Sequence, residues 1–273
     1  MSRKTIRSWS HGVARIHAVA RNTFIEASRN RAFVGLAIAA VGLVGSGIAL
    51  SQLAIRDQAA RVLVDFGLFA ISLLSVVIAT VMGVILIFKE VDRKTFYLVL
   101  SKPVRRSEVV AGKFFGLLAI LVVTVVGLGA AWMLSLWSRD VPLHLDMVKA
   151  LILIGVEAAL MTAVALFFSS FATPIMSGVF TIGIFLVGRS VALLDELLSA
   201  KKGMLVQSPF ARAVARLVTA TFPDLSTFHV GKQVILGLPV GWDYVGAAAL
   251  YALGYIVLFL ALGMLIFQRK DFV

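Results

Sequence analysis

The chain has 273 residues, of which 60% are hydrophobic and 15% are charged, and it contains no cysteine. This apolar share is far above that of a soluble globular domain, so the composition indicates an integral membrane protein. The lack of cysteine excludes disulfides, thiolate catalysis and cysteine metal sites, and the net charge of +12 has to be interpreted from its distribution along the chain.

Residues 12–31 are predicted to form an amphipathic helix at the membrane surface. Apolar side chains recur there at the three- and four-residue spacing of one helix face. They are Val13, Ile16, Ala20, Phe24 and Ala27. Such a helix buries its apolar side at the headgroup boundary and sets its basic side against anionic lipid. The alternative is an ordinary solvated basic leader.

Six segments are long and apolar enough to cross a membrane. Four stretches of 23 to 25 residues carry no charge, and residues 147–194 form a 48-residue region that fits two spans joined by a turn near Pro174. A bilayer core of about 30 Å needs roughly 20 helical residues. We predict one transmembrane domain, residues 1–273, with spans at 32–53, 66–88, 114–137, 147–168, 174–194 and 244–267.

The basic residues are distributed unequally between the two sides of these spans. If the N-terminus is cytoplasmic, residues 1–31, 89–113 and 269–273 carry sixteen Lys and Arg and five acids, whereas the opposite side carries eight of each. Basic residues are enriched in cytoplasmic loops, so both termini are predicted to be cytoplasmic. The basic excess is therefore a topology signal, and no nucleic-acid partner is expected.

Residues 89–113 form a basic island between the second and third spans. Its seven Lys and Arg surround an apolar block, residues 96–100. Pro103 disfavours helical geometry at the preceding residue, and Ser107 can cap a second helix that continues into the third span. The pattern predicts a helix, a sharp turn and a helix beside the membrane. The alternative is that the apolar block only lies on the lipid surface.

Small and aromatic residues indicate where the spans pack. The first span contains Gly35, Gly42, Gly45 and Gly47, and Gly112 and Gly116 lie four residues apart at the start of the third. Such residues permit close helix approach in lipid. Trp132 and Trp137 are predicted at the outer membrane interface, where amphipathic rings are favoured.

Residues 195–243 form the one large outer segment between the fifth and sixth spans. Phe210, Val214 and Leu217 repeat at helical spacing, and Pro223 closes the pattern. We predict one or two short helices that rest on the outer membrane surface or dip into it.

Catalytic motifs are not found in the sequence. The four histidines, His11, His17, His144 and His229, are scattered without metal-ligand spacing, and no G-x-S-x-G or H-E-x-x-H motif occurs. Gly112 and Lys113 come nearest to a phosphate-binding loop, but Ser107 and Phe114 stand where a Walker A loop needs Gly and Ser or Thr. We therefore expect no enzyme activity, cofactor or metal in this chain, and nucleotide, if used, to bind another chain.

Glu157 is the one acidic residue placed within a predicted span. An ionisable group at membrane depth is costly and is a functional candidate by default. It could be a proton or substrate site. It could equally be held by a partner such as Arg189, or by hydroxyls of neighbouring helices, as a packing device.

Several short motifs along nearly the whole chain carry a family resemblance. They are NTFIEASRNRAF at 22–33, Glu90, Thr95, LVLSKPVRR at 98–106, Gly112 with Lys113, FFSSFATP at 167–174, TFPDLSTF at 221–228 and IFQRKDF at 266–272. With these motifs the chain resembles permease subunits of type-2 ATP-binding-cassette (ABC-2) exporters, in the branch of the NosY-like permeases. Many relatives have Gly-Thr where this sequence has Lys94 and Thr95.

The resemblance implies an all-α membrane protein with six spans, an interfacial N-terminal helix, a cytoplasmic coupling helix between spans 2 and 3, and short outer helices between spans 5 and 6. It implies a bacterial inner-membrane exporter in which two permeases, identical or different, dock on a cytoplasmic ATPase dimer that binds ATP and Mg. The implied docking residues are Glu90, Arg93, Thr95, Phe96, Tyr97, Val99, Leu100, Pro103, Arg105, Arg106 and Lys113.

Two other functions remain open from the sequence. One is a membrane scaffold that converts ATP-driven motion into mechanical work on an extracytoplasmic partner through residues 195–243. The other is a secondary transporter that uses Glu157. No residue identifies the transported substrate.

Overall fold

The computed structural model describes residues 3–54, 58–92, 106–199 and 209–269, and these contain helices and no strand. The helices are α1 (Arg3–Ser28), α2 (Arg31–Leu53), α3 (Ala59–Asp92), α5 (Arg106–Trp137), α6 (Leu145–Ser169), α7 (Pro174–Ser199), α9 (Pro209–Thr221), the 3-10 turn η2 (Ser226–Phe228), α10 (Gly231–Ile235) and α11 (Trp242–Arg269). Six of them, α2, α3, α5, α6, α7 and α11, are long and apolar enough to span a membrane. The predicted all-helical membrane fold with six spans is confirmed.

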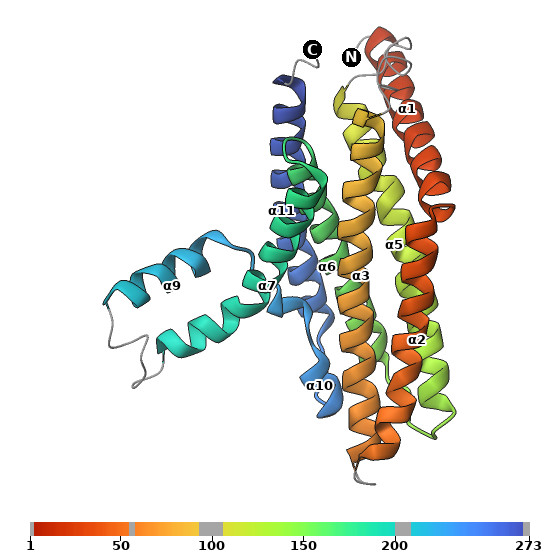
Figure 1. The fold of residues 1–273 in the computed structure, drawn as a ribbon, viewed down its shortest axis with the longest axis vertical. Coiled ribbons are helices and arrows are strands. Elements are labelled where there is room, and N and C mark those ends of the chain that lie inside the picture. Colours follow the sequence, from red (N-terminus) through yellow and green to blue (C-terminus); the bar gives the residue numbers. More distant parts are fainter. Residues whose placement is uncertain (1–2, 55–57, 93–105, 200–208, 270–273) are drawn as a thin grey trace.

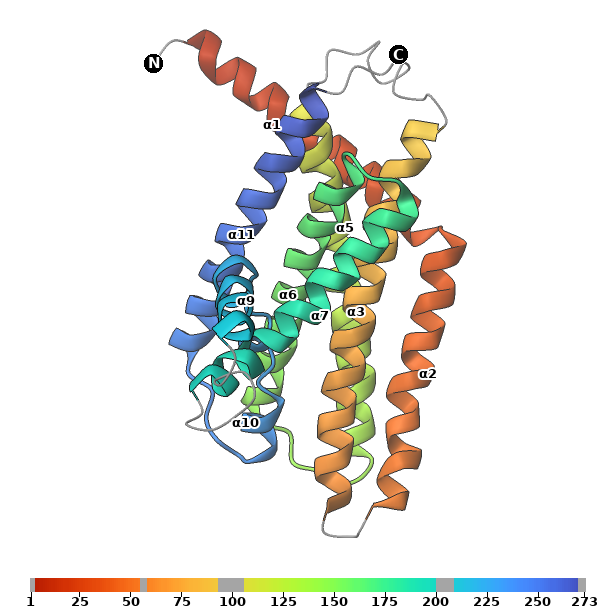
Figure 2. The same ribbon diagram turned by 60° about the vertical axis from the view of Figure 1, so that its left-hand side comes forward.

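The spans run along the long axis of the molecule, and the chain reverses direction between consecutive spans (Figure 1). The beginning of α1, the end of α3, the beginning of α5 and the end of α11 all lie at one end (Figure 2). The α2–α3 and α5–α6 connections lie at the opposite end. The two helix ends that flank residues 93–105 therefore lie at the same end of the bundle as the beginning of α1 and the end of α11.

Helices α3 and α6 form the centre of the bundle. In the most apolar 18-residue stretch of each of these two helices, 67% is buried inside the protein. The corresponding values are 17% for α2 and 11% for α11. Large side chains such as Leu68, Ile71, Met82, Leu153 and Leu160 are enclosed there. The peripheral helices leave most of their apolar surface uncovered, which suits a lipid environment because lipid tails solvate aliphatic side chains.

Two helices extend beyond the predicted spans. Helix α3 begins at Ala59, before the predicted span at 66–88, and α7 continues to Ser199 beyond the predicted span at 174–194. A charged residue ends an apolar run without ending the helix, because its side chain can face water on a helical turn outside the bilayer. Helix α5 begins at Arg106, so Ser107 lies in its first turn and is not the residue that precedes it.

Helix α1 is longer than predicted and packs along the first turns of α5. The backbone of α1 comes so close that a Cβ at Gly112 would lie 3.0 Å from the Ile16 carbonyl oxygen, and one at Gly116 would lie 2.6 Å from the Thr23 Cβ. Thr23 and Ala27 are buried in this contact. Thr23, which was not among the predicted apolar residues, is enclosed by protein, and Val13 is exposed on the protein surface. The contact of this helix with the membrane surface stays a prediction.

The two tryptophans of α5 have different surroundings. Trp137 is 69% exposed, as expected for an interfacial ring. Trp132 is 0% exposed and its indole Nε1 donates a hydrogen bond to the Leu63 carbonyl of α3 at 3.2 Å. Gly67 makes room for this ring, since any Cβ there would overlap the indole. The interfacial prediction for Trp132 was wrong because the glycine opposite it opens a place for the ring between α3 and α5.

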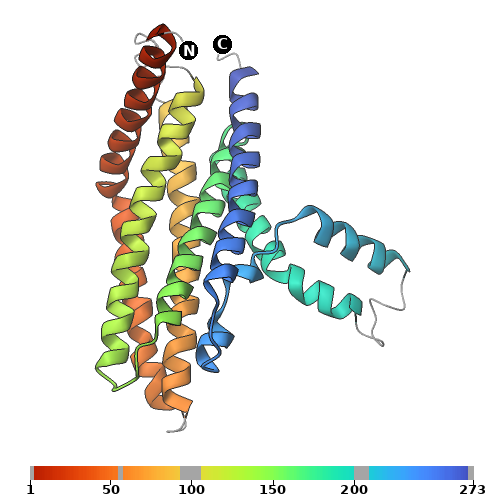
Figure 3. The ribbon, with the colours of Figure 1, turned by 180° about the vertical axis from the view of Figure 1, so that it is seen from behind.

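The outer segment contains α9, η2 and α10. The last turns of α7 and helix α9 lie side by side and project sideways from the bundle (Figures 1 and 3). The chain then returns to α7, where the Leu225 amide donates to the Gly188 carbonyl at 3.1 Å. The prediction of one or two short helices in this segment is confirmed, and its location at the outer membrane surface stays a prediction.

The glycines of α2 differ in what they contact. A Cβ at Gly47 would lie 3.1 Å from the ring of Phe66 on α3. A Cβ at Gly35, Gly42 or Gly45 would meet nothing within 4 Å in the part of the chain that the structure describes. Close packing therefore applies to Gly47 within this chain.

Candidate functional site

The predicted docking region lies between α3 and α5. Glu90 is in the last turn of α3 and Arg106 is the first residue of α5. The other predicted docking residues before Lys113 lie outside the described residues; they are Arg93, Thr95, Phe96, Tyr97, Val99, Leu100, Pro103 and Arg105. Their role as an ATPase contact stays a prediction, while the two helices that flank them are well defined.

Lys113 connects these two flanking helices. Its Nζ donates a 2.7 Å hydrogen bond to the carbonyl oxygen of Leu86 on α3, and the residue is only 4% exposed. An ammonium group removed from water needs such acceptors, so the bond is costly to break. The end of α3 and the beginning of α5 are therefore linked through this side chain.

The N-terminal helix is attached to the same place. Arg15 of α1 forms an ion pair with Glu108 of α5 at 3.4 Å, beside the close contact at Gly112 and Gly116. The three helices α1, α3 and α5 thus form one unit next to the predicted docking region.

A buried charge pair lies in the centre of the bundle. Glu157 of α6 is 0% exposed, and its Oε2 is 3.0 Å from Nη2 of Arg189 on α7. Ser72 of α3 donates to the same oxygen at 2.9 Å and accepts from Arg189 Nη2 at 2.6 Å. The sequence left two alternatives for Glu157, and the structure contains the predicted pairing with Arg189 and with a hydroxyl of a neighbouring helix.

This cluster retains hydrogen-bonding capacity. Glu157 Oε1 and Arg189 Nε have no hydrogen-bond partner among the residues that the structure describes. A carboxylate can accept at both oxygens and a guanidinium carries five donors, so each group has an unused site. The cluster connects α3, α6 and α7 and could accept a proton, a water molecule or a polar ligand group.

His229 lies just after η2 and is near enough to Arg189 for the two charges to interact. Burial lowers the pKa of its imidazole below the ordinary 6.5, and the positive charges of Arg189 and Lys232 lower it further. Asp65 acts in the opposite direction. The neutral imidazole is therefore favoured beside Arg189, and sequence analysis missed it because only the fold brings residue 229 to α7.

A second charge cluster, which sequence analysis also missed, lies at the beginning of α6. Lys149 Nζ is 2.8 Å from Asp146 Oδ1 and donates to the Val240 carbonyl at 2.6 Å, while the Val240 amide donates to Asp146 Oδ1 at 3.2 Å. The ammonium also lies 5.4 Å from the ring centre of Trp242. The three-residue spacing of Asp146 and Lys149 was the only sequence signal for this cluster. We call the contact of Asp146 and Lys149 with the backbone of Val240 the clamp.

The sequence of this six-span chain matches a known protein family. Residues 16–272 match the model of the ABC-2 family transporter proteins. The chain therefore belongs to this family, and it is a membrane permease component of an ABC transporter. A comparison with curated proteins finds no significant match.

Proposed function

We propose that this chain is an exporter permease of the NosY-like branch, in which ATP hydrolysis by a separate subunit drives export across a bacterial inner membrane. The chain contains no nucleotide-binding motif, so ATP and Mg bind the partner. Residues 89–113 are the proposed docking element, and both termini are proposed to be cytoplasmic. A second permease copy, identical or different, completes the transporter.

One observation supports this proposal beyond the family match. The helices on both sides of residues 93–105 are joined directly, through Lys113 and the Leu86 carbonyl. A docking element that only bound a partner would not need this connection. A bond between the flanking helices suits an element that receives a displacement and passes it into the membrane domain.

In this mechanism, closure of the ATPase dimer pushes residues 89–113. The apolar side chains Phe96, Tyr97, Val99 and Leu100 supply buried contact area, and Glu90, Arg93, Arg105 and Arg106 orient the contact. The push tilts α3 and α5 together and changes access to a path between the two permeases.

The test combines co-purification with coupled assays. The combined variant Phe96→Ala, Arg105→Glu, Arg106→Glu should insert into membranes normally, lose the ATPase subunit in mild detergent, and lose ATP-dependent transport. A matched charge reversal at two exposed residues, Arg61 near the beginning of α3 and Arg139 just after the end of α5, should retain both. Normal coupled transport by the first variant would contradict the proposal.

A second candidate function is mechanical work on an extracytoplasmic partner. The observation that favours it is the hairpin of α7 and α9, which projects from the bundle with Phe210 and Leu217 exposed. A chain of this kind would co-purify with the ATPase and stimulate its hydrolysis while moving no solute. Assays of hydrolysis and solute movement in the same vesicles distinguish the two functions.

A further inference from the structure

His229 lies between η2 and α10 in a segment whose backbone is held in place by local hydrogen bonds. The amide and the hydroxyl of Ser226 both donate to Asp224 Oδ1, at 2.9 and 2.6 Å, and these bonds fix the turn before the histidine. The His229 amide donates to the Ser226 carbonyl at 2.9 Å. The position of the imidazole is therefore set by the turn that precedes it.

This segment packs against the turn of α7 that carries Arg189. The Leu225 amide binds the carbonyl of Gly188, the residue that precedes Arg189. A Cβ at Gly188 would lie 2.7 Å from Leu225 Cγ and 2.8 Å from the Pro223 carbonyl oxygen. The segments that carry His229 and Arg189 are therefore in direct contact.

Asp65 of α3 faces the imidazole across a glycine. His229 Nε2 and Asp65 Oδ1 lie 3.3 and 3.5 Å from the position that a Gly231 Cβ would take, so both atoms are grouped around the bare α-carbon of this residue. The charged groups that face the imidazole are Asp65 of α3, Arg189 of α7 and Lys232 of α10. A proton on His229 is attracted by the first of these groups and repelled by the other two.

The medium at one end of the bundle has access to this group of charges. Asp65 is exposed and lies in the first two turns of α3, and His229 is half-buried. Both α10 and the beginning of α3 lie toward the end of the bundle opposite the two termini (Figure 2). A proton can therefore reach the imidazole from the medium at that end.

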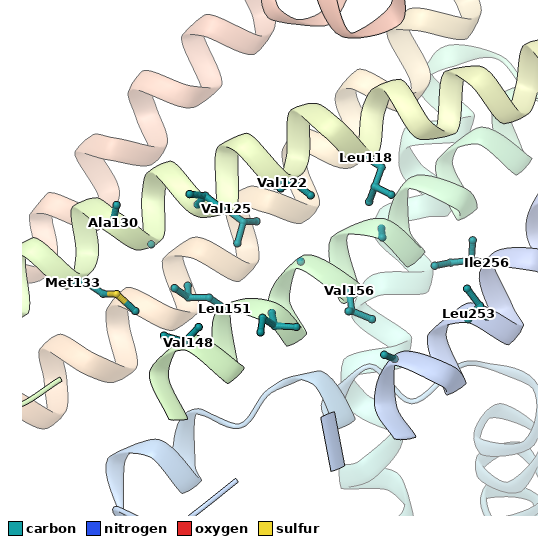
Figure 4. Close-up of a pocket in the computed structure, with 16 residues that line it drawn as sticks. Leu118, Val122, Val125, Ala130, Met133, Val148, Leu151, Val156, Leu253 and Ile256 are labelled. Atoms are coloured by element: carbon teal, nitrogen blue, oxygen red, sulfur yellow. The ribbon is translucent and has the colours of Figure 1, made fainter. Parts of the chain in front are cut away.

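The opposite side of α6 provides no such access to the pair of Glu157 and Arg189. There, a groove between α5, α6 and α11 is lined by aliphatic side chains, methionine and glycine (Figure 4). Val156 and Ala159 line this groove, and Glu157 is not among the lining residues. The groove therefore offers no polar route to the pair, whereas His229 is a titratable group beside Arg189.

We propose that His229 is a proton-binding site through which the medium at the end opposite the two termini controls the pair of Glu157 and Arg189. With a neutral imidazole, Arg189 binds Glu157 and Ser72 and connects α7 to α6 and α3. A proton on His229 adds a second positive charge beside Arg189, which weakens the pair and loosens α7. This inference concerns proton binding alone and stands whether or not residues 89–113 contact an ATPase.

The coupling between the proton and the pair is reciprocal. Burial and then the charge of Arg189 lower the pKa of His229. By linkage, a proton on His229 opposes the charge of Arg189 in its bound position to the same extent. The proton affinity of His229 therefore measures the effect that the proton has on Arg189.

The first test measures this proton affinity by NMR on the full-length chain in phospholipid nanodiscs, with ¹³C at the histidine Cε1. Arg189→Leu should raise the proton affinity of His229 about three- to tenfold, because it removes a nearby positive charge. Asp65→Asn should lower it. Arg139→Gln removes an exposed charge just after α5 and should leave it unchanged. An unchanged affinity in Arg189→Leu would overturn the proposal.

The second test follows α7 directly and does not require a variant of the buried pair. Because the chain has no cysteine, spin labels can be attached at Leu193→Cys on α7 and Val41→Cys on α2, both of which are exposed. Pulsed electron paramagnetic resonance should give one label distance at pH 7.5 and a second, additional distance at pH 5. Asp65→Asn should move this change to lower pH, and His229→Gln should abolish it.

Three outcomes of the second test would overturn the proposal. One is an unchanged distance distribution between the two pH values. Another is a change that persists in His229→Gln, which would assign the proton to Glu157 itself. The third is found in vesicles with uniformly oriented chains, if the change follows only the pH of the medium at the end that carries the termini.

Discussion

Helix α6 carries two charge pairs that differ in how completely they are satisfied. At its beginning, Asp146 and Lys149 both bind the backbone of Val240, so the acid and the amine each have a second partner. In its middle, Glu157 and Arg189 share Ser72, but Glu157 Oε1 and Arg189 Nε have no partner among the described residues. Two pairs on one helix therefore differ in their unused hydrogen-bonding capacity.

This difference separates a fixed clamp from a pair that can exchange partners. Breaking the Asp146 cluster releases the chain before α11 and offers no obvious replacement contacts. In the Glu157 cluster, each charged group has one site at which a further hydrogen bond can form. A buried pair with unused sites also costs more when one member is lost, since the remaining charge is already poorly solvated.

Arg189→Leu is expected to have the largest effect. It leaves the Glu157 carboxyl enclosed with only Ser72 as partner, and breaking a buried pair costs about 3–5 kcal/mol in free energy of unfolding. Thermal unfolding in detergent measures the loss. The double variant Glu157→Leu, Arg189→Leu should recover most of it, and equal losses in the single and double variants would show that the pair itself contributes little.

Lys149→Met is expected to have a smaller effect. The Val240 carbonyl loses its donor, but Asp146 keeps the Val240 amide and is partly exposed to solvent. An unsatisfied buried acceptor costs about 1–3 kcal/mol. The same unfolding assay checks this value. A loss larger than that of Arg189→Leu would show that the Asp146 cluster contributes more to stability than the Glu157 pair.

The pH dependence of stability tests the environment of His229 beside Arg189. The folded pKa of His229 is lowered below 6.5, so as the pH falls below about 6.5 the unfolded chain binds a proton that the folded chain resists. The free energy of unfolding should be constant above this pH with respect to His229 and should decrease as the pH falls toward the folded pKa. His229→Gln should flatten this part of the curve in thermal unfolding between pH 7.5 and 5, values that bracket the histidine range. An unchanged slope would rule out this imidazole as the cause.

Loss of the ion pair between Arg15 and Glu108 is expected to have the smallest effect on the free energy of unfolding. It serves as the reference for a partly exposed ion pair. The Arg15 side chain is one-third exposed, and such pairs contribute about 0.2–1 kcal/mol that salt screens. Arg15→Gln should lower stability by that amount at low ionic strength and by less in high salt. A salt-independent loss would indicate that Arg15 acts through packing on α5.

The number of spans was predictable because uncharged stretches of span length are a property of the sequence alone. The two alternatives for Glu157, a functional site or a paired structural charge, were also predictable. An ionisable group within a span is costly and is therefore either functional or paired. The clamp of Asp146, Lys149 and Val240 was not, because two of its residues act on a backbone more than ninety positions away. Trp132 was placed at the interface because no sequence rule connects it with Gly67.

The docking residues between 93 and 105 remain predictions, and the structure instead defines the helices around them. The extra turns of α3 and α7 could not be derived from hydropathy, because charges such as Arg61 and Asp65 end an apolar run while the helix continues into water.

Lys113 and Trp132 together have a consequence for how α3 and α5 can move. Both side chains of α5 donate to carbonyls of α3, Lys113 to Leu86 at one end and Trp132 to Leu63 at the other. The two bonds are separated by nineteen residues of α5, which is about 28 Å at 1.5 Å per residue. Axial sliding would stretch both bonds at once, so the two bonds oppose shear between the helices over a length close to the thickness of the bilayer core.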